Sequence, residues 1–577
     1  MQMDMVNVTI DSKTVSVNKN STVLLAAHKA GINVPTLCYH PELRPEGACR
    51  VCMVEVEGAR TLVASCVYPV NEGMVIRTNT EKVRQARKGV VELLLANHPQ
   101  SCLYCVRNGN CELQNIAAEL GIREVPFWGG ERKCSRLDDT NPSLVRDNEK
   151  CILCGRCVKV CSERQGLSVY SFTHRGFDTI VSPAFEEGLC NAPCTYCGQC
   201  SAVCPTAALT EKDDTNRVWS VLNDPTKHVV VQTAPAVRTA LGEVLDMEPG
   251  SIVTGKMVAA LRHMGFDKVF DTDFSADLTI MEEGYEFIHR LQNGGKMPMI
   301  TSCSPGWVNF AEICYPELLD HLSTAKSPQQ MFGAVVKTYY AEKAGIAPKD
   351  IVCVSVMPCT AKKSEAVRIE MDASGYRDVD IVMTTRELGR MIKQTGLDFA
   401  KLAPEEYDDP MGISTGAGVI FGATGGVMEA AVRTVYEVLT GEELKKVDFE
   451  SVRGLQSLKE ATINVAGTEV KMAVVNTLAE ADKMMKRVKE GTADYHFIEI
   501  MACPGGCLGG GGQPVPINYE VRMKRKDAIY KADEMSIMRK SHENPAVKTL
   551  YEDFLGKPNG EKAHQLLHTH YQRQCRG

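Results

Sequence analysis

Three short segments of the chain combine cysteine with glycine or proline in patterns that could hold an inorganic cluster. Residues 501–507 (Met-Ala-Cys-Pro-Gly-Gly-Cys) contain two thiols separated by three residues and precede a glycine run at 509–512. Glycine tolerates positive φ and lets the main chain approach a ligand closely, so this loop can wrap around a cluster. Residues 301–307 (Thr-Ser-Cys-Ser-Pro-Gly-Trp) and 357–363 (Met-Pro-Cys-Thr-Ala-Lys-Lys) carry further cysteines. We expect the three segments to meet at one site.

The overall composition narrows the class of protein. The chain has 577 residues, 24 cysteines and a net charge of −7. Its length predicts several domains, and its acidic balance argues against a nucleic-acid-binding protein, whose surface is basic. No apolar run approaches the roughly 20 residues that span a bilayer, and the opening Met-Gln-Met-Asp lacks the features of a secretory signal. We therefore expect a cytoplasmic protein whose cysteines bind metals instead of forming disulfides.

Two cysteine runs share one spacing. Residues 151–161 and 194–204 both follow the pattern Cys-x2-Cys-x2-Cys-x3-Cys. This pattern is typical of proteins with two [4Fe–4S] clusters, in which the fourth cysteine of each run binds the other cluster. Cys134 and Cys190 fall outside the pattern and are predicted to be free, buried thiols. The two predicted ligand sets are Cys151, Cys154, Cys157 and Cys204, and Cys194, Cys197, Cys200 and Cys161.

Two further ligand sets precede these runs. One has four cysteines and suits a [2Fe–2S] centre; the other has one histidine and three cysteines and suits a [4Fe–4S] cluster. Either set could bind structural zinc instead. The first set is Cys38, Cys49, Cys52 and Cys66, and the second is His98, Cys102, Cys105 and Cys111. Four centres in succession have no folding rationale, so they predict electron transfer over a distance.

The elements around these cysteines predict small α+β domains. Alternating apolar residues at 6–10 and 15–17 predict a β-hairpin, and a helix is expected at 22–30. With the cysteine loop that follows, residues 1–80 resemble a β-grasp [2Fe–2S] domain.

The next two modules follow from the cysteine spacing. A histidine-ligated [4Fe–4S] domain is expected at 81–140, and its first helix carries an apolar stripe of Val90, Leu93 and Leu94. The bacterial, two-cluster ferredoxin-like domain is expected at 141–215.

Residues 216–577 change character and predict a large α/β domain. Four short apolar runs, at 229–231, 297–300, 351–356 and 497–500, each end at a polar or cysteine-bearing turn. Such runs are typical of strands in a buried, largely parallel sheet. Because ligands gather beyond the carboxyl ends of these strands, the cysteine-bearing turns fall where a site is expected.

A glycine-rich stretch at 422–426, before a predicted helix, could indicate phosphate binding. It lacks the lysine of a P-loop and the spacing of a dinucleotide-binding loop. Close packing against the cluster loop is therefore the favoured interpretation.

The three cysteine-bearing segments are similar to the three signatures of [FeFe]-hydrogenases. The order of modules along the whole chain also resembles the large, multi-cluster members of that family. The resemblance implies an enzyme that catalyses 2 H⁺ + 2 e⁻ ⇌ H₂ at an H-cluster. That cofactor is a [4Fe–4S] cubane joined through one cysteine to a two-iron subsite with CO, cyanide and an azadithiolate bridge.

The same resemblance implies roles for residues around the H-cluster. Cys359, Cys503 and Cys507 match cubane ligands, and Cys507 matches the one shared with the two-iron subsite. Lys362 matches a residue that pairs with a cyanide, where a fixed ammonium can stabilise the anion. The matches to residues packed around the subsite are Pro235, Gln329, Met357, Lys362, Phe421 and Met501.

A proton path is implied as well. Its matches are Cys303, Glu283, Ser323 and Glu286, with Arg290 at the outer end. Glu283 and Glu286 are three residues apart and can share one helix face, and partly buried carboxylates of raised pKa suit proton relay. Without the resemblance, a solvated helix face is the simpler interpretation of the two glutamates.

Ser304 departs from the family pattern, which has two adjacent cysteines here. The first serves proton transfer and the second is the fourth cubane ligand, whereas this chain has Cys303-Ser304. Serine is the poorer ligand because iron–sulfur sites favour thiolate. Three outcomes are open: Ser304 binds as an alkoxide, Cys303 shifts to become a ligand, or the cubane is altered and activity is reduced.

Two alternatives to a fully active hydrogenase remain. An electron-relay subunit, like the large peripheral subunit of respiratory NADH dehydrogenase, would explain residues 1–213 but has no need of the later cysteines. A hydrogen sensor of low activity would be compatible with Ser304. The expected electron partners are ferredoxin or flavin-bearing subunits that oxidise NAD(P)H, and the substrates are protons and H₂.

Overall fold

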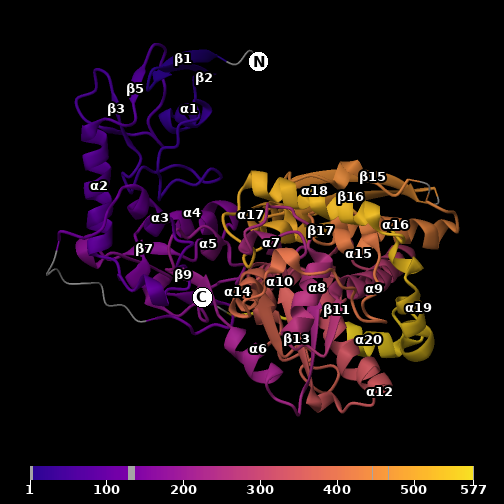
Figure 1. The fold of residues 1–577 in the computed structure, drawn as a ribbon. Coiled ribbons are helices and arrows are strands. Elements are labelled where there is room, and N and C mark those ends of the chain that lie inside the picture. Colours follow the sequence, from indigo (N-terminus) through magenta and orange to yellow (C-terminus); the bar gives the residue numbers. More distant parts are fainter. Residues whose placement is uncertain (1–3, 128–136, 445, 466, 576–577) are drawn as a thin grey trace.

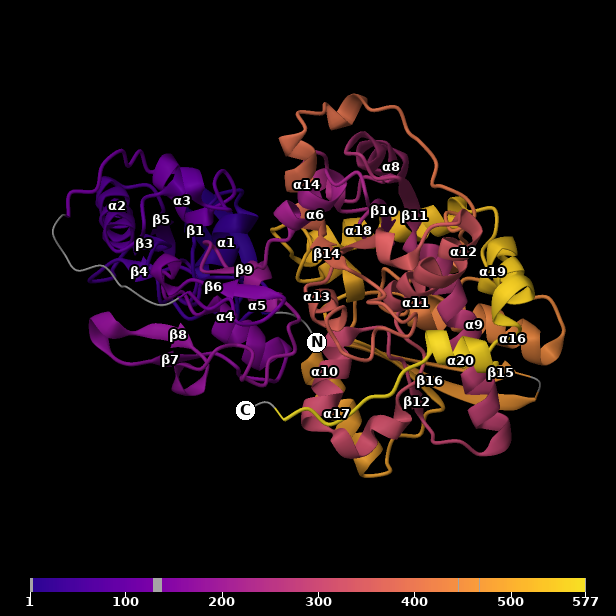
Figure 2. The ribbon, with the colours of Figure 1, turned by 90° about the horizontal axis from the view of Figure 1, so that it is seen from below.

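The computed structural model describes residues 4–127, 137–444, 446–465 and 467–575. A smaller N-terminal half, in indigo and purple, lies beside a larger half formed by the rest of the chain (Figures 1 and 2). Cys134 is outside the described residues. Within the described part of the chain, no helix has both the length and the apolar composition to cross a membrane.

The N-terminal domain is built on a five-stranded sheet with the order β2-β1-β5-β3-β4. β1 (Met5–Ile10) and β2 (Lys13–Asn18) form the expected antiparallel hairpin. Asp11 and Ser12 have φ of 45° and 74°, as a tight two-residue turn requires. α1 (Val23–Lys29) follows and buries its apolar face on the sheet. The remaining strands are β3 (Met53–Val56), β4 (Val63–Ala64) and β5 (Val75–Arg77).

Two helices flank the histidine-containing loop. The predicted apolar stripe of α2 (Glu81–Ala96) is wrong in part, because Leu93 is 59% exposed. The helix instead buries Val83 and Val91, which lie on a neighbouring face. α3 (Glu112–Glu119) begins directly after the loop and closes this small core.

An internal repeat forms the ferredoxin-like domain. Each cysteine run leads into a four-residue helix that follows a left-handed glycine, Gly155 or Gly198. The helices are α4 (Arg156–Lys159) and α5 (Gln199–Ala202). Two antiparallel strand pairs frame them: β6 (Leu144–Arg146) with β9 (Leu209–Glu211), and β7 (Ser171–Thr173) with β8 (Ile180–Ser182). The matching local geometry follows from the matching spacing of the two runs.

The α/β region contains two four-stranded sheets. One, with the order β11-β10-β13-β14, is entirely parallel. The other, with the order β12-β17-β16-β15, ends in one antiparallel pair. The strands of the first are β10 (His228–Thr233), β11 (Lys268–Asp271), β13 (Ile351–Met357) and β14 (Ile381–Thr384). The strands of the second are β12 (Met299–Ile300), β15 (Leu458–Val465), β16 (Thr468–Asn476) and β17 (Phe497–Met501). All four predicted apolar runs lie at these strands.

The long helix α9 (Thr272–Asn293) joins the cores of the two sheets. Phe274 and Leu278 pack in the first core, and Ile280 and Phe287 pack in the second. The helices α11 (Pro328–Val335), α15 (Gly416–Ile420) and α16 (Gly426–Thr440) lie against it. A helix that contacts both sheets can present side chains to a space between them.

The C-terminal segment, from residue 519 onward, packs on the α/β region. Its helices are α18 (Tyr519–Met535), α19 (Pro545–Leu550) and α20 (Glu561–Leu567). The last residues run in an extended yellow segment toward the smaller half (Figure 2). There Gln572 and Gln574 hydrogen-bond to Glu312 of α10 (Pro305–Cys314).

Candidate functional site

A cavity lies between the two sheets, beyond the carboxyl ends of their strands. The turns after β10 and β13 reach it from one sheet, and the turns after β12 and β17 reach it from the other. The three cysteine-bearing segments therefore meet, as expected. The predicted residues that line the cavity are Pro235, Cys303, Ser304, Gln329, Met357, Cys359, Lys362, Phe421, Met501, Cys503 and Cys507.

Three thiols converge on this cavity. Burial raises the pKa of Cys359, Cys503 and Cys507, and neighbouring thiols raise the pKa of Cys503 and Cys507 further. Such thiols stay protonated on their own and become good ligands when a metal displaces the proton. The donor set therefore fits an iron–sulfur cluster.

The ammonium group of Lys362 is fixed at the cavity wall. Its Nζ donates to the carbonyl of Cys303 at 3.1 Å and to Oε2 of Glu365 at 3.0 Å. Gln329 is held in the same network, because its Nε2 donates to Glu365 at 3.1 Å and its Oε1 accepts from Ser355 at 3.0 Å. A held cation in an apolar wall suits an anionic ligand of a cluster.

Glycines let the loops touch one another around the cavity. A Cβ atom at Gly510 would lie 2.1 Å from the carbonyl oxygen of Pro358, and one at Gly506 would lie 2.7 Å from the amide of Thr424. A Cβ atom at Gly511 would lie 2.4 Å from the carbonyl oxygen of Cys197. The run at 509–512 thus has no room for side chains at the boundary with the ferredoxin-like domain.

Cys303 and Ser304 have different surroundings. Ser304 lies at the start of α10, and its Oγ accepts a hydrogen bond from the amide of Ala502 at 3.3 Å. Cys303 packs in the core that contains Phe421 and Met501. Burial raises the pKa of the Cys303 thiol, and the charge of Glu283 raises it further. Ser304 therefore adjoins the segment of Cys503, whereas Cys303 is close to Glu283 of α9.

Ser323, Glu286 and Arg290 are joined by hydrogen bonds, and the buried carboxylate of Glu283 lies beside them without a hydrogen bond to a described residue. Burial and the charge of Glu286 raise the pKa of Glu283 to about 8, and an interaction with Ser323 partly offsets the rise. Ser323 Oγ donates to Glu286 at 2.7 Å, and Arg290 donates to the same carboxylate at 2.6 Å. A solvated helix face is wrong for both glutamates, because Glu283 is buried and the Glu286 side chain is only 12% exposed.

A second buried network adjoins Glu286, and sequence reasoning missed it. The amide of Thr324 donates to Glu286 at 3.1 Å, and Thr324 Oγ1 lies 2.8 Å from Nδ1 of His568. Nε2 of His568 lies 3.0 Å from the fully buried carboxylate of Glu282. The adjacent pair Glu282-Glu283 was the only signal in the sequence, since the histidine comes from a segment 244 residues beyond Thr324.

The two cysteine runs are interleaved in space. The cysteines of a small cavity come from both runs, three from the first and Cys204 from the second. Burial and the charges of Cys197, Cys194 and Cys161 raise the pKa of Cys200, which places these four thiols close together. Cys197 also lines the cavity between the sheets. The members of the first set are Cys151, Cys154, Cys157 and Cys204. Cys190, predicted to be buried, is only half-buried and contacts Asn191.

The remaining two ligand sets lie in the N-terminal half. Cys38 hydrogen-bonds with Cys49 and Cys66, and Cys66 also contacts Cys52. In the other set, burial lowers the pKa of His98 to about 4, so its imidazole is neutral, as metal binding requires. Its three cysteines, Cys102, Cys105 and Cys111, are partly exposed.

The spread of the cysteine sets bears on the zinc alternative. Tetrahedral zinc with bonds of about 2.3 Å holds its sulfurs about 3.8 Å apart. Among the described residues, ligand atoms gather within 4.8 Å of one another in two clusters of three, and neither contains a cysteine. No cysteine set in the described part of the chain brings three ligand atoms as close together as one zinc ion would hold them, although thiols of the Cys38 set are in contact in pairs.

The glycine-rich stretch before α16 already holds an anion of the protein. The carboxylate of Glu499 accepts hydrogen bonds from the amides of Gly425 at 2.6 Å and Met428 at 2.8 Å. This buried carboxylate from β17 fills the positive end of the helix, where a phosphate would bind. The nucleotide alternative is therefore wrong for this stretch.

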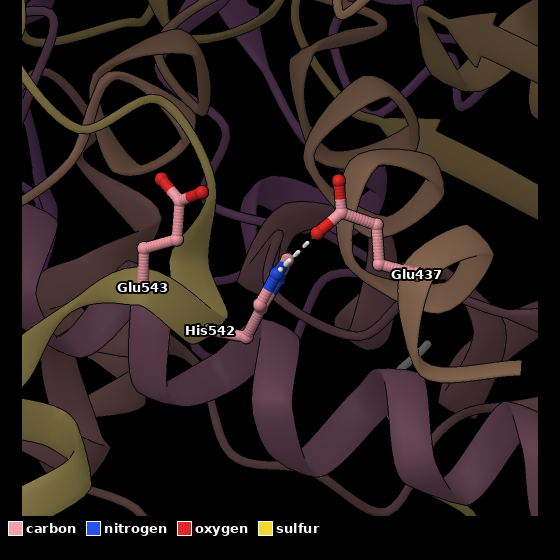
Figure 3. Close-up of side chains that lie close together, drawn as sticks. All are labelled: Glu437, His542 and Glu543. Carbon is pink, nitrogen blue, oxygen red and sulfur yellow. Dashed lines mark hydrogen bonds and ion pairs between the residues drawn. The ribbon is translucent and has the colours of Figure 1, made fainter. Parts of the chain in front are cut away.

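One cluster outside the cavity combines Glu437, His542 and Glu543 (Figure 3). His542 points toward Glu437, at 2.9 Å, while Glu543 stands apart from that pair. Nζ of Lys540 lies 2.7 Å from Glu437 and 3.4 Å from Glu543. Because the ammonium of Lys540 pairs with both carboxylates, we interpret this cluster as an ion-pair network.

Comparison with known proteins shows which family has this architecture. Residues 227–511 match the C-terminal domain of the iron-only hydrogenase large subunit. Subunit HndD of the NADP-reducing hydrogenase from Solidesulfovibrio fructosivorans is 52% identical over the full length of both chains. The chain belongs to the iron-only hydrogenase family. Iron hydrogenase 1 of Clostridium pasteurianum is 42% identical, over 99% of this chain and 100% of the relative.

Smaller family matches divide this hydrogenase into modules. They are a 2Fe-2S binding domain at 3–81, an NADH-ubiquinone oxidoreductase-G iron–sulfur region at 87–126, a 4Fe-4S dicluster domain at 150–208 and an iron hydrogenase small subunit at 519–574. A solved structure of the [FeFe]-hydrogenase HydA1 from Chlamydomonas reinhardtii is 45% identical, with a TM-score of 0.57, over 63% of this chain and 99% of that one.

These matches confirm the expected family, its order of iron–sulfur modules and its enzymatic class. The electron-relay alternative is disfavoured, because the relay-like region ends where the hydrogenase domain begins.

Proposed function

We propose that the chain catalyses 2 H⁺ + 2 e⁻ ⇌ H₂ at an H-cluster in the cavity between the two sheets. The observation that carries this proposal is the convergence of Cys359, Cys503 and Cys507 with Lys362 on one buried cavity in a hydrogenase-family chain. When bound, the cluster supplies the redox-active iron at which H–H bonds form and break. The chain supplies ligands, proton transfer and electron transfer.

The proposed cofactors are one [2Fe–2S] centre, three accessory [4Fe–4S] clusters and the H-cluster with its CO, cyanide and azadithiolate ligands. Cys503 and Cys359 would hold the cubane, and Cys507 would hold it and join it to the two-iron subsite. Lys362 Nζ would pair with a cyanide. The residues proposed to pack around the subsite are Pro235, Gln329, Met357, Phe421 and Met501.

Proton transfer is proposed to run along Cys303, Glu283, Ser323 and Glu286 to Arg290. The Cys303 thiol would hold a proton at Sγ beside the cavity, and the raised pKa of Glu283 would keep its carboxyl protonated at neutral pH. The Ser323 hydroxyl, which donates to Glu286, can pass a proton by reorienting. Arg290 would hold Glu286 in place near the surface.

Electrons are proposed to reach the cavity through the cluster that includes Cys197, because this residue lines both sites. The cluster held by Cys204 and the first cysteine run would pass electrons to it. The histidine-ligated and [2Fe–2S] centres would lie further from the cavity along the electron path. Flavin-bearing subunits that oxidise NAD(P)H are the favoured partners, since the relative HndD is named as a subunit of an NADP-reducing hydrogenase. Ferredoxin is the alternative donor, and the cytoplasm is the proposed location.

An anaerobic infrared spectrum of the matured protein tests the proposal, with H₂ evolution assayed on the same sample. Bands of intrinsic CO and cyanide together with turnover are expected. Cys503→Ala and Cys507→Ala should each abolish turnover while the N-terminal clusters remain visible by EPR. Full activity in either variant would refute the site, and bands without turnover would point to the sensor alternative.

A further inference from the structure

We propose that Ser304 holds the fourth corner of the cubane through its side-chain oxygen, and that this corner is the one from which iron is lost on oxidation. This inference rests on the proposed function, because it assumes that a cubane occupies the cavity. It assigns one outcome to the substitution of serine for cysteine at this position. It also implies a cubane with three strong corners and one weak corner.

The position of the turn at 303–306 places Ser304 on the cubane side of the cavity. A Cβ atom at Gly306 would lie 3.0 Å from Cβ of Ala502 and 3.6 Å from Cβ of Cys197. The turn is therefore held between the segment that carries Cys503 and the nearest accessory cluster. Ser304 Oγ accepts its hydrogen bond from the amide of Ala502, next to that cysteine. A cubane bound by Cys503 would face this same turn.

Cys303 is held away from that corner. Its carbonyl accepts from Lys362 at 3.1 Å, and its side chain packs in the core with Phe421 and Met501. After Ser304 the turn continues into α10 at Pro305, and the fully buried indole of Trp307 ties the helix back to the start of the segment by donating to the carbonyl of Thr301 at 3.0 Å. A shift of Cys303 into the ligand position would break these contacts. The geometry therefore favours the oxygen of the next residue.

The chemistry of the corner follows from its donor atom. On cluster assembly the Ser304 hydroxyl loses its proton to solvent, and the amide of Ala502 can stabilise the resulting alkoxide. Oxygen binds iron–sulfur clusters less well than thiolate does, and a C–O bond is shorter than a C–S bond, so the donor reaches less far. Oxidation should then release one iron: [4Fe–4S]²⁺ gives [3Fe–4S]⁺, Fe²⁺ and one electron, which a one-electron oxidant such as ferricyanide accepts.

EPR of the full-length protein, loaded with its iron–sulfur clusters but without the two-iron subsite, can detect this release. Oxidised [2Fe–2S] and [4Fe–4S] clusters are diamagnetic, so a three-iron cluster stands alone in the spectrum. During a ferricyanide titration, the unmodified chain should develop this signal and lose close to one iron. Ser304→Cys should lose most of the signal, and Ser304→Ala should show it at lower oxidant concentration.

Ser162→Cys is the matched control, because Ser162 also follows a cluster cysteine but bonds to the helix carbonyls of Val158 and Lys159. It should leave the three-iron signal unchanged. Equal signals in the unmodified chain and Ser304→Cys would overturn the inference, as would equal behaviour of the unmodified chain and Ser304→Ala. Loss of the cubane in Cys303→Ala would instead assign the ligand to Cys303.

The iron content of Cys503→Ala separates this inference from the proposed function. If that variant lacks the iron of one cubane while Ser304→Cys matches the unmodified chain, only the inference about Ser304 fails. If Cys503→Ala keeps its full iron content and the matured protein shows no CO or cyanide bands, the proposed catalytic site itself fails.

Discussion

Nη2 of Arg522 lies 2.8 Å from both carboxylate oxygens of Glu42, and so joins α18 to the [2Fe–2S] domain 480 residues earlier in the chain. The two side chains are only 7% and 16% exposed. Arg164 adds to the contact by donating to the carbonyl of Glu42 at 2.8 Å. The outermost electron-transfer domain is therefore anchored by the last segment of the catalytic half.

Arg522→Ala should loosen this anchor by about 2 kcal/mol, because it leaves a poorly exposed carboxylate without its charged partner. Hydrogen exchange of the amides at 40–46 should become faster, while the H-cluster infrared bands stay unchanged. Arg44→Ala is the control. The Arg44 side chain is 82% exposed, and its ion pair with Glu163 is long, at 3.9 Å, and therefore weak. Equal exchange in the two variants would show that the anchor lies elsewhere.

The rate of H₂ evolution should fall as the pH rises through about 8, the raised pKa of Glu283. Below that pH the carboxyl is neutral and can pass its proton, whereas above it the carboxylate must first take up a proton. Glu283→Gln should lower the rate at every pH and remove the alkaline fall. Asp277→Asn is the control. Burial also raises the pKa of Asp277, to about 7, but its carboxylate accepts a hydrogen bond from Thr415 and is not part of the proposed proton path.

Protein stability should follow the same titration of Glu283. Its pKa is higher in the fold than its ordinary value of 4.5, so the folded state binds this proton more tightly. The stabilising contribution is complete below pH 4.5 and is lost as the pH rises through about 8. Thermal unfolding as a function of pH measures it, and an identical curve for Glu283→Gln would assign the loss to another group.

Glu286→Gln should reduce turnover by about 10²-fold and leave the infrared bands of the cluster in place. The amide keeps hydrogen-bonding atoms near Ser323 and Thr324 but cannot relay a proton as a carboxylate does. Steady-state H₂ evolution measures the effect. Glu317→Gln, which alters an exposed pair with Lys489, serves as the control. An unchanged rate in Glu286→Gln would exclude this residue from the path.

Arg433→Met should destabilise the α/β region by about 2–3 kcal/mol. Arg433 is fully buried and pairs with Glu429 at 2.7 Å and Asp533 at 2.8 Å, both also fully buried. Its removal leaves each buried carboxylate with one arginine partner in place of two, Arg453 for Glu429 and Arg539 for Asp533. A lower midpoint of thermal unfolding is expected, whereas Lys343→Met, which breaks an exposed pair with Asp553, should have no measurable effect. Similar midpoints would contradict the assignment.

Spacing predicted the four accessory ligand sets, because two residues between cysteines bring their thiols to one side of a turn, whereas the ligand roles of Cys359, Cys503 and Cys507 came from the family resemblance. The apolar runs likewise predicted four strands, because a strand that is buried on both faces appears in the sequence as a nearly continuous apolar run. The sequence did not reveal that these strands form two sheets with the cavity between them. That arrangement depends on α9, whose Phe274 and Phe287 pack in different cores.

Contacts between distant segments were equally beyond the sequence. His568 becomes a partner of Glu282 because the C-terminal segment folds back onto α9. In the sequence, Glu499 is one polar residue inside an apolar run. In the structure, its carboxylate accepts a hydrogen bond from the amide of Gly425, at the start of α16. The exposure of Leu93 shows the converse, because an apolar stripe is buried only where another element covers it.

The tight fit of Gly511 against Cys197 leaves little distance between the ferredoxin-like domain and the cavity between the sheets. Electron tunnelling slows steeply as the gap between two redox centres widens, and at this boundary Gly511 lies directly against the backbone of Cys197 and Gly198. A side chain at residue 511 would push the two halves apart and lengthen the final electron transfer. We therefore expect the glycine run to keep the proposed accessory cluster and the proposed catalytic cluster close together, so that the backbone itself sets their separation.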